Sequence, residues 1–188
     1  MSEGLLDERR DALENEFFHK EDEKKIAALR AHMQEQTTKE ELQKASGMTD
    51  DAVLEQMVAL GLNGKTVAAL SLVPLIAVAW ADGVIQDNER TAIMSGAAGK
   101  GLEPGSPGYE LLEKWLAKQP PDTLITAWEA YIKSLASQLN DEQNRLLRTQ
   151  IVNFARVVAE SAGGFLGIGR VSGAEDKVLH RIGAAFDR

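Results

Sequence analysis

The segment that most constrains the fold spans residues 67–89, with the sequence VAALSLVPLIAVAWADGVIQDNE. From its start to Ala81 only Ser71 is clearly polar, so a helix formed here would be buried on nearly all sides. A membrane-spanning helix needs roughly 20 apolar residues, whereas this run lies between Lys65 and Asp82 and is shorter. We therefore expect the central helix of a helical bundle.

Pro74 lies inside this apolar run. Proline has no backbone N–H, and its ring clashes with the carbonyl group four residues earlier, so a proline inside a helix bends it. We therefore predict one kinked helix, with the bend between Leu70 and Pro74.

Composition excludes several classes of function. Of the 188 residues, 44% are hydrophobic, which is enough for an ordinary globular core. The chain has no cysteine, which excludes disulfides, thiolate metal sites and thiol nucleophiles and agrees with a reducing compartment. The net charge of -8 opposes binding to nucleic acid or to an anionic membrane, because such binding relies on Lys and Arg. The opening MSEGLLDERR has neither the basic start nor the apolar stretch of an export signal, so we expect a cytoplasmic protein without transmembrane segments.

Residues 1–47 predict a highly charged helical arm. One long helix is expected over residues 5–36, and its narrow apolar stripe includes Ile26, Leu29 and Met33. Such a helix buries little by itself, so it either packs along the bundle or contacts another chain.

Two features of the arm carry further predictions. Thr37 with Glu40, and Thr38 with Glu41, have the spacing of a capping box, so we expect a second short helix that starts here and stops by residue 47. The rings of the adjacent Phe17 and Phe18 point about 100° apart on a helix. We therefore predict that one ring packs on the chain's own bundle while the other meets a second subunit or a separate protein partner.

The rest of the chain predicts a short helix and turn over residues 48–65, followed by a bundle over residues 66–188. Apolar residues recur at helical spacing throughout, and no stretch alternates as a strand would, so the fold class is all-α. The predicted core includes Leu72, Leu75, Ile76, Ala79, Ile93, Trp128, Phe154, Val158 and Ile182, with Leu146 and Val157 as further candidates.

An internal repeat refines this bundle. The stretch AVAWADGVIQDNERTAIM is echoed by RVVAESAGGFLGIGRVSGAEDKVL, with Gly83 aligned to Gly163. Each copy then places an acid at the start of a helix, Glu89 in the first and Glu175 in the second. We therefore predict two related helix-loop-helix units packed together.

These residues carry a family resemblance. AWADGVIQDNER and its degenerate second copy resemble the TerB-like superfamily of tellurite-resistance proteins, also found in DjlA-type co-chaperones, over about residues 66–188. The resemblance implies a non-enzymatic, stress-related interaction module that binds a protein partner or forms a homo-oligomer. It also implies metal-associated acids in the loop, here Asp82 and Glu89, although Ala162 replaces the acid of the second copy. The arm is similar to the N-terminus of small ATPase-regulating subunits of bacterial ATP synthase, which leaves a regulator of a larger machine as an alternative.

The carboxylates of the first loop suggest a candidate metal site. Asp82, Asp87 and Glu89 would hold a hard cation such as Ca²⁺ or Mg²⁺ weakly, with waters completing the shell. A true EF-hand is excluded, because its first two ligand positions would fall on Val78 and Trp80. The alternative is that these acids cap or complement helix starts.

The glycine-rich run at residues 163–170 lacks the lysine–hydroxyl pair of a nucleotide-binding loop. We expect a long interhelical turn whose Phe165 and Leu166 either pack into the bundle or, if exposed, form a partner-binding site. No residue is predicted to be catalytic, since the three histidines are scattered and no serine has a nucleophile-elbow context. A helical enzyme with carboxylate chemistry is the alternative function.

Overall fold

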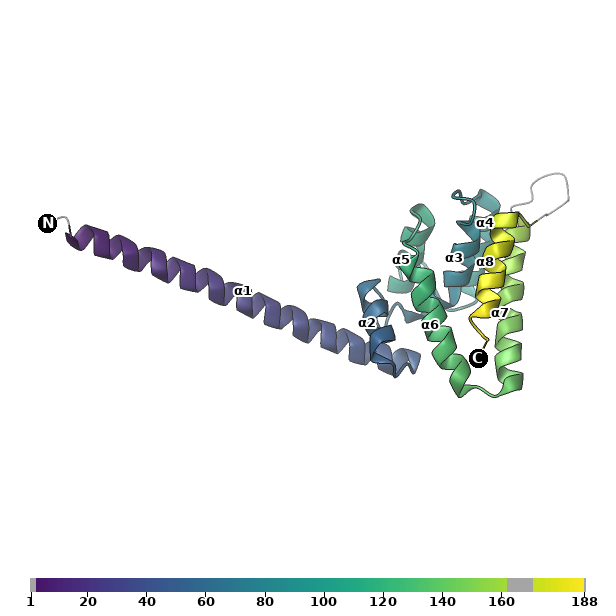
Figure 1. Cartoon of the computed structure of the whole chain (residues 1–188). Helices are drawn as coiled ribbons and strands as arrows, with labels where there is room; N and C mark the ends of the chain where they lie inside the picture. Colours follow the sequence, from purple (N-terminus) through teal and green to yellow (C-terminus); the bar gives the residue numbers. More distant parts are fainter. Residues whose placement is uncertain (1–2, 162–170, 188) are drawn as a thin grey trace. The chain divides into compact units, whose positions relative to one another are not determined.

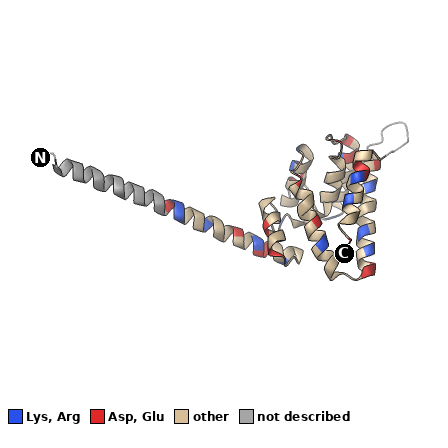
Figure 2. Ribbon diagram, in the orientation of Figure 1, with Lys and Arg blue, Asp and Glu red and all other residues tan. Residues whose placement is uncertain are grey.

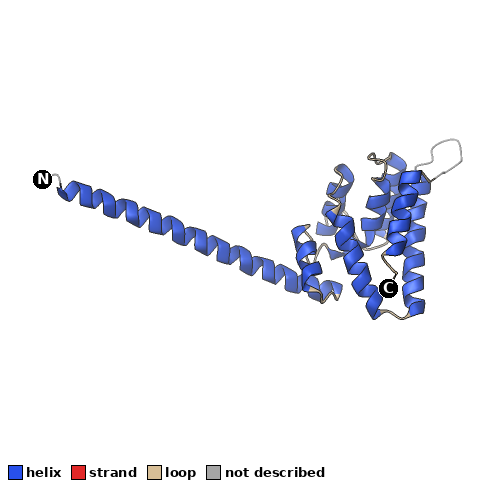
Figure 3. Cartoon of the chain, in the orientation of Figure 1, coloured by secondary structure: helices blue, strands red, loops and turns tan. Residues whose placement is uncertain are grey.

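The structure is a computed structural model that describes the backbone of residues 3–161 and 171–187, and the side chains of residues 23–161 and 171–187. Every regular element in these ranges is a helix, which confirms the all-α prediction (Figure 3). In chain order the elements are α1 (Glu3–Ser46), α2 (Asp51–Ala59), the 3₁₀ helix η1 (Val67–Leu72), α3 (Val73–Ala79), α4 (Asp87–Ala98), α5 (Pro107–Ala117), α6 (Thr123–Gln138), α7 (Asp141–Ser161) and α8 (Gly173–Ala184) (Figure 1).

The chain divides into two compact units, Met1–Glu40 and Glu41–Arg188. The first unit is formed by α1. The second contains the last residues of α1 together with α2, η1 and α3–α8, and it is a helical bundle with a continuous apolar core.

Helix α1 runs without a break through the point where the sequence predicts a second helix. The hydroxyl groups of Thr37 and Thr38 do not cap a new helix; they donate to the carbonyl oxygens of Met33 and Gln34 at 2.9 and 2.8 Å. The same residue types therefore sit in the interior of a helix, bonded to the preceding turn. The predicted break at Thr37 is wrong, whereas the predicted end is confirmed, since Gly47 follows the helix with a φ of 70°.

Several other helix starts carry side-chain caps. The Ser106 hydroxyl accepts the Tyr109 N–H at 3.3 Å and begins α5. Asn140 and Gln143 bond each other's backbone N–H groups at the start of α7, at 2.8 and 3.0 Å. Helix α2 is capped by the carboxylate of Asp50.

The central apolar segment is not one kinked helix. Residues 67–72 form η1, and a separate helix α3 begins at Val73. Pro74 lies in the first turn of α3, where the missing N–H breaks no bond and the fixed φ favours a helix start. The prediction of a kink is therefore corrected: proline begins a new helix here.

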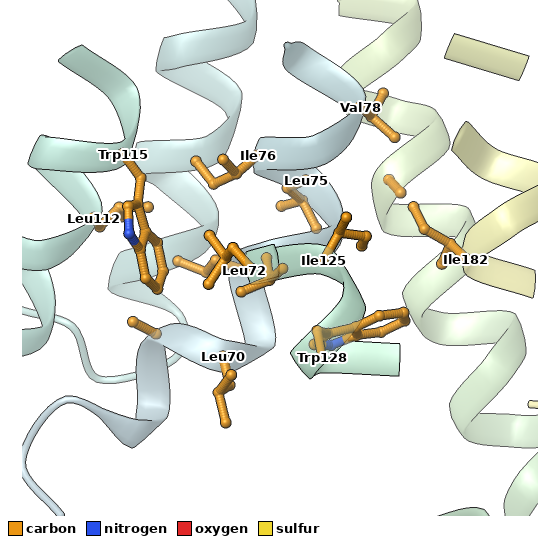
Figure 4. Packing of buried hydrophobic residues seen from close by; sticks show 14 of the residues in the cluster. Leu70, Leu72, Leu75, Ile76, Val78, Leu112, Trp115, Ile125, Trp128 and Ile182 are labelled. Carbon is orange, nitrogen blue, oxygen red and sulfur yellow. The ribbon is translucent and has the colours of Figure 1, made fainter. Parts of the chain in front are cut away.

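Side chains of η1 and α3 form the centre of the core (Figure 4). They lie between Leu112 and Trp115 of α5 on one side and side chains of α6 and α8 on the other. Apart from Leu146 and Val157, the core residues predicted from the sequence are all buried except Phe154, which is half-buried. Leu146 and Val157 of α7 are exposed, so their prediction as core is wrong. The buried part of α7 is a narrow face with two alanines, and its apolar residues extend beyond that face.

Gly96 allows α4 and α7 to pack closely. A Cβ atom at this position would lie 2.1 Å from Cζ of Phe154, well inside van der Waals contact. The half-buried ring of Phe154 therefore packs directly on the backbone of α4.

Replacing Gly96 with alanine should cost about 1–3 kcal/mol, because the ring must move out of a packed site, and should return roughly 1 kcal/mol because alanine is the better helix former. We therefore expect the free energy of unfolding to fall by up to about 2 kcal/mol. Urea unfolding measures the change. The matched control is Gly99→Ala, where the new Cβ meets only ordinary contacts, and Gly96→Ala combined with Phe154→Leu should recover part of the loss. A stabilised Gly96→Ala protein would contradict this packing.

Candidate functional site at two acidic helix starts

Glu89 is a buried acid at the start of α4. The residue before the helix, Gln86, has an extended backbone, and its N–H donates to Oε2 of Glu89 at 2.8 Å. The Glu89 side chain satisfies one of the backbone N–H groups that a helix start leaves without an intrahelical partner. Glu89 is 2% exposed, which is rare for glutamate in a folded protein.

Glu175 has the same role at the start of α8. The Ser172 N–H donates to Oε2 of Glu175 at 2.5 Å, and the Glu175 N–H donates to the Ser172 hydroxyl at 3.2 Å. Glu175 is 6% exposed. The two acids that the sequence repeat aligns thus occupy the same position of their helices, whereas the construction of the whole bundle from two related units stays a prediction.

The electrostatic environment of Glu89 opposes its ionisation. Burial raises the pKa of Glu89 from 4.5 to about 7, although the hydrogen bond from the Gln86 N–H acts in the opposite direction. The negative charges of Glu175 and Asp82 raise this pKa further. The two helix starts are therefore close enough for their carboxylates to repel each other.

The loop that precedes α4 explains the Ala-Asp-Gly motif. Oδ1 of Asp82 accepts the Val84 N–H at 3.0 Å, and the Gly83 N–H donates to the Trp80 carbonyl at 2.9 Å. Gly83 has a φ of 89°, a conformation that costs glycine little and other residues more. The motif therefore forms a tight turn between α3 and α4.

The three acids predicted to bind metal do not fit a metal site as they are arranged. Asp82 and Asp87 are exposed, whereas Glu89 is buried and bonded to its own helix start. Among the side chains of residues 23–161 and 171–187, no group of three or more His, Asp or Glu is placed to hold an ion. Weak binding of a hard cation thus stays a prediction without a structural site.

The predicted partner-binding residues lie outside the described side chains. Phe165 and Leu166 lie outside the described residues, and the side chains of Phe17 and Phe18 lie outside them too, although their backbone belongs to α1.

A pocket of about 210 Å³ opens between α3, α6 and α8, with Ile76, Trp80 and Val178 among its apolar walls. Its cationic residue, Arg181, is already paired: Nε and one terminal nitrogen bond the Glu129 carboxylate at 2.6 and 2.8 Å. The sequence does not predict the Arg181–Glu129 pair, because 52 residues separate its members and no local pattern links them. Neither Glu89 nor Glu175 lines the pocket, although Asp122 does, and its negative charge contributes to raising the pKa of Arg181.

Helix α1 carries large apolar side chains in water. Ile26, Leu29 and Met33 are 50%, 60% and 60% exposed. Their spacing of three and four residues places them on one face of the helix. We call these three residues the α1 stripe; the sequence predicts them as a stripe, and the structure shows them exposed.

Comparison with models of known protein families, with curated proteins and with solved structures found no match. Within the described part of the chain, no helix combines the length and the apolar character needed to cross a membrane.

Proposed function

We propose that this chain is a non-enzymatic helical interaction module that binds a protein partner through the α1 stripe. The observation that carries the proposal is the exposure of Ile26, Leu29 and Met33 in one row on a single helix. The TerB-like resemblance of the bundle supports a binding role, in a stress-related and cytoplasmic setting.

The energetics of α1 support a partner. Burying an apolar side chain of this size contributes about 1.5–3 kcal/mol, and each residue of the stripe keeps at least half of its surface exposed. Covering the stripe would therefore contribute roughly 3 kcal/mol by the same area argument. In most proteins the stability of a helix comes from packing of its apolar face, so a contact along the stripe would also stabilise α1.

One observation favours an enzyme as the second candidate. The pKa of Glu89, raised to about 7, lies in the range that general acid–base catalysis uses. The geometry argues against this role, because the Glu89 and Glu175 carboxylates face the backbone of their own helix starts. The interaction module is therefore the better-supported function.

Affinity capture from native cells tests the proposal. Full-length protein with Ile26→Gln, Leu29→Gln and Met33→Gln keeps its charge and a good helix former at each position, yet it loses the apolar stripe. We expect this variant to lose most of the captured partner. The matched control is Ala28→Gln with Ala31→Gln, which lies on the opposite face and should capture as wild type does. Equal capture by all three proteins would contradict the proposal.

A further inference from the structure

The α1 stripe lies in a short basic stretch, bordered by Glu23 and Glu35, of a chain whose net charge is negative. Residues 24–34, KKIAALRAHMQ, contain Lys24, Lys25 and Arg30 and no acid, whereas the whole chain has a net charge of -8. Figure 2 shows Lys and Arg in blue on the described part of α1. All of residues 24–34 are exposed, so their charges are available to a partner.

The positions of these charges around the helix decide which of them can contact a partner that packs on the stripe. At about 100° per residue, the stripe covers an arc of about 60°. Lys25 lies about 70° to one side of its centre, and Arg30 lies about 70° to the other side. Lys24 lies on the opposite face of the helix. The stripe is therefore a narrow apolar seam with Lys25 on one side and Arg30 on the other, and Glu23 lies one heptad before Arg30 on the Arg30 side.

We propose that the partner of the α1 stripe is an acidic amphipathic helix of another protein. Its apolar row packs on Ile26, Leu29 and Met33, and its Asp and Glu side chains on either side of that row face Lys25 and Arg30. The spacing of three and four residues is that of the seam between two helices in a coiled coil. This inference rests on the proposed function and specifies the chemistry of the partner.

A second copy of the chain fits the stripe less well. In a parallel pair of helices, the flank that holds Lys25 faces the flank that holds Arg30 in the other copy. In an antiparallel pair, each flank faces the same flank of the other copy. Lys25 then meets Arg30 or a second Lys25, and like charges destabilise the pair. Glu23 can offset this repulsion only on the Arg30 flank. An acidic helix replaces this repulsion with attraction on both sides.

An anionic membrane also fits less well. Helices that lie in the membrane interface bury a wide apolar face, whereas the stripe is one row of three residues. The overall negative charge of the chain adds repulsion from an anionic surface.

Two synthetic helical peptides test the inference on the full-length protein. Both carry leucines at coiled-coil seam positions; one has glutamate at all flanking positions, and the other has lysine there. Fluorescence anisotropy should show binding of the acidic peptide, with the basic peptide at least about tenfold weaker, since several exposed charge pairs change sign. Added salt should weaken the acidic complex.

Variants locate the contact. Lys25→Glu with Arg30→Glu should weaken the acidic peptide by about tenfold and improve binding of the basic one. Lys25→Glu alone should weaken the acidic peptide, whereas its neighbour Lys24→Glu makes the same charge change on the far face and should leave the affinity unchanged. Far-ultraviolet circular dichroism checks that helicity is retained in each variant.

Each alternative occupant of the α1 stripe predicts a different result in these experiments. Equal affinity for the two peptides, or equal effects of Lys24→Glu and Lys25→Glu, would overturn the inference. Stripe-dependent binding to phosphatidylserine vesicles without peptide binding would assign the surface to a membrane, and stripe-dependent dimerisation in sedimentation would assign it to a second copy.

If cellular capture depends on the stripe but the acidic peptide is not preferred, this inference fails and the proposed function stands. If capture is independent of the stripe, the proposed function fails.

Discussion

Replacing Glu89 with glutamine is expected to stabilise the protein above pH 7 and to flatten the pH dependence of its stability. In the folded protein the pKa of Glu89 is about 7, compared with 4.5 for an ordinary glutamate. The folded state therefore holds this proton more tightly than the unfolded state does. The associated stability is fully present below about pH 4.5, and it is lost as the pH rises through about 7, by up to about 3 kcal/mol.

Glutamine removes the titration and keeps the cap. Its carbonyl oxygen still accepts the Gln86 N–H that the Glu89 carboxylate accepts now. Above pH 7 the Glu89→Gln protein avoids a buried negative charge, so we expect it to exceed wild type in free energy of unfolding by up to about 3 kcal/mol.

Urea unfolding of both proteins at several pH values between 4 and 8.5 gives the difference in stability directly. Glu89→Ala is the control, because it removes the charge and the acceptor together and should be less stable than Glu89→Gln at every pH. Parallel stability curves for wild type and Glu89→Gln would show that Glu89 is ionised normally in the fold.

Replacing Trp128 with alanine is expected to lower the free energy of unfolding by about 3–5 kcal/mol. Trp128 on α6 is 1% exposed, and its ring meets the ring of Phe186 edge-on, with centroids 6.3 Å apart and planes at 70°. Phe186 follows α8 and is itself buried. The substitution therefore leaves a large cavity where Phe186 packs on α6.

Denaturant unfolding measures this loss, and Trp128→Phe should cost less because it keeps an aromatic ring in the site. A double-mutant cycle with Phe186→Ala should show a coupling of about 0.5–1.5 kcal/mol for the ring pair. A loss of less than 1 kcal/mol for Trp128→Ala would contradict the packing at this site.

The core could be predicted from the sequence because apolar residues at helical spacing leave few ways to be buried. Ile93, Trp128 and Ile182 lie on helices shorter than α7, and all are buried as predicted. Helix α7 shows the limit of this rule. It is long and its apolar residues cover more than one face, so Leu146 and Val157 match the period and yet lie outside the contact.

Helix boundaries were less predictable, because the same side chain serves different local structures. The hydroxyl of Thr37 can cap a helix start or bond the preceding turn, and only the conformation of the neighbouring residues decides between them. Pro74 likewise can bend a helix or begin one. The sequence could place an interruption near residue 74, but it could not show that a 3₁₀ helix precedes the proline.

At the candidate site, the repeat correctly singled out Glu89 and Glu175 as equivalent helix-start acids. Their burial, and the repulsion that raises the pKa of Glu89, depend on how two helices distant in sequence pack together. The spacing of residues along the sequence does not predict how these two helices pack. On α1, by contrast, the stripe follows directly from helical geometry, because residues 23–37 lie on an exposed helix.

Hydrogen–deuterium exchange tests the central claim most directly, when it is measured on the full-length protein alone and in the complex that it captures from cells. Exchange in α1 is expected to be fast in the free protein, since the α1 stripe and its neighbours are exposed. In the complex, the amides of residues 23–36 should exchange much more slowly. Unchanged exchange over these residues, with protection confined to the bundle, would show that the partner binds elsewhere and would contradict the account.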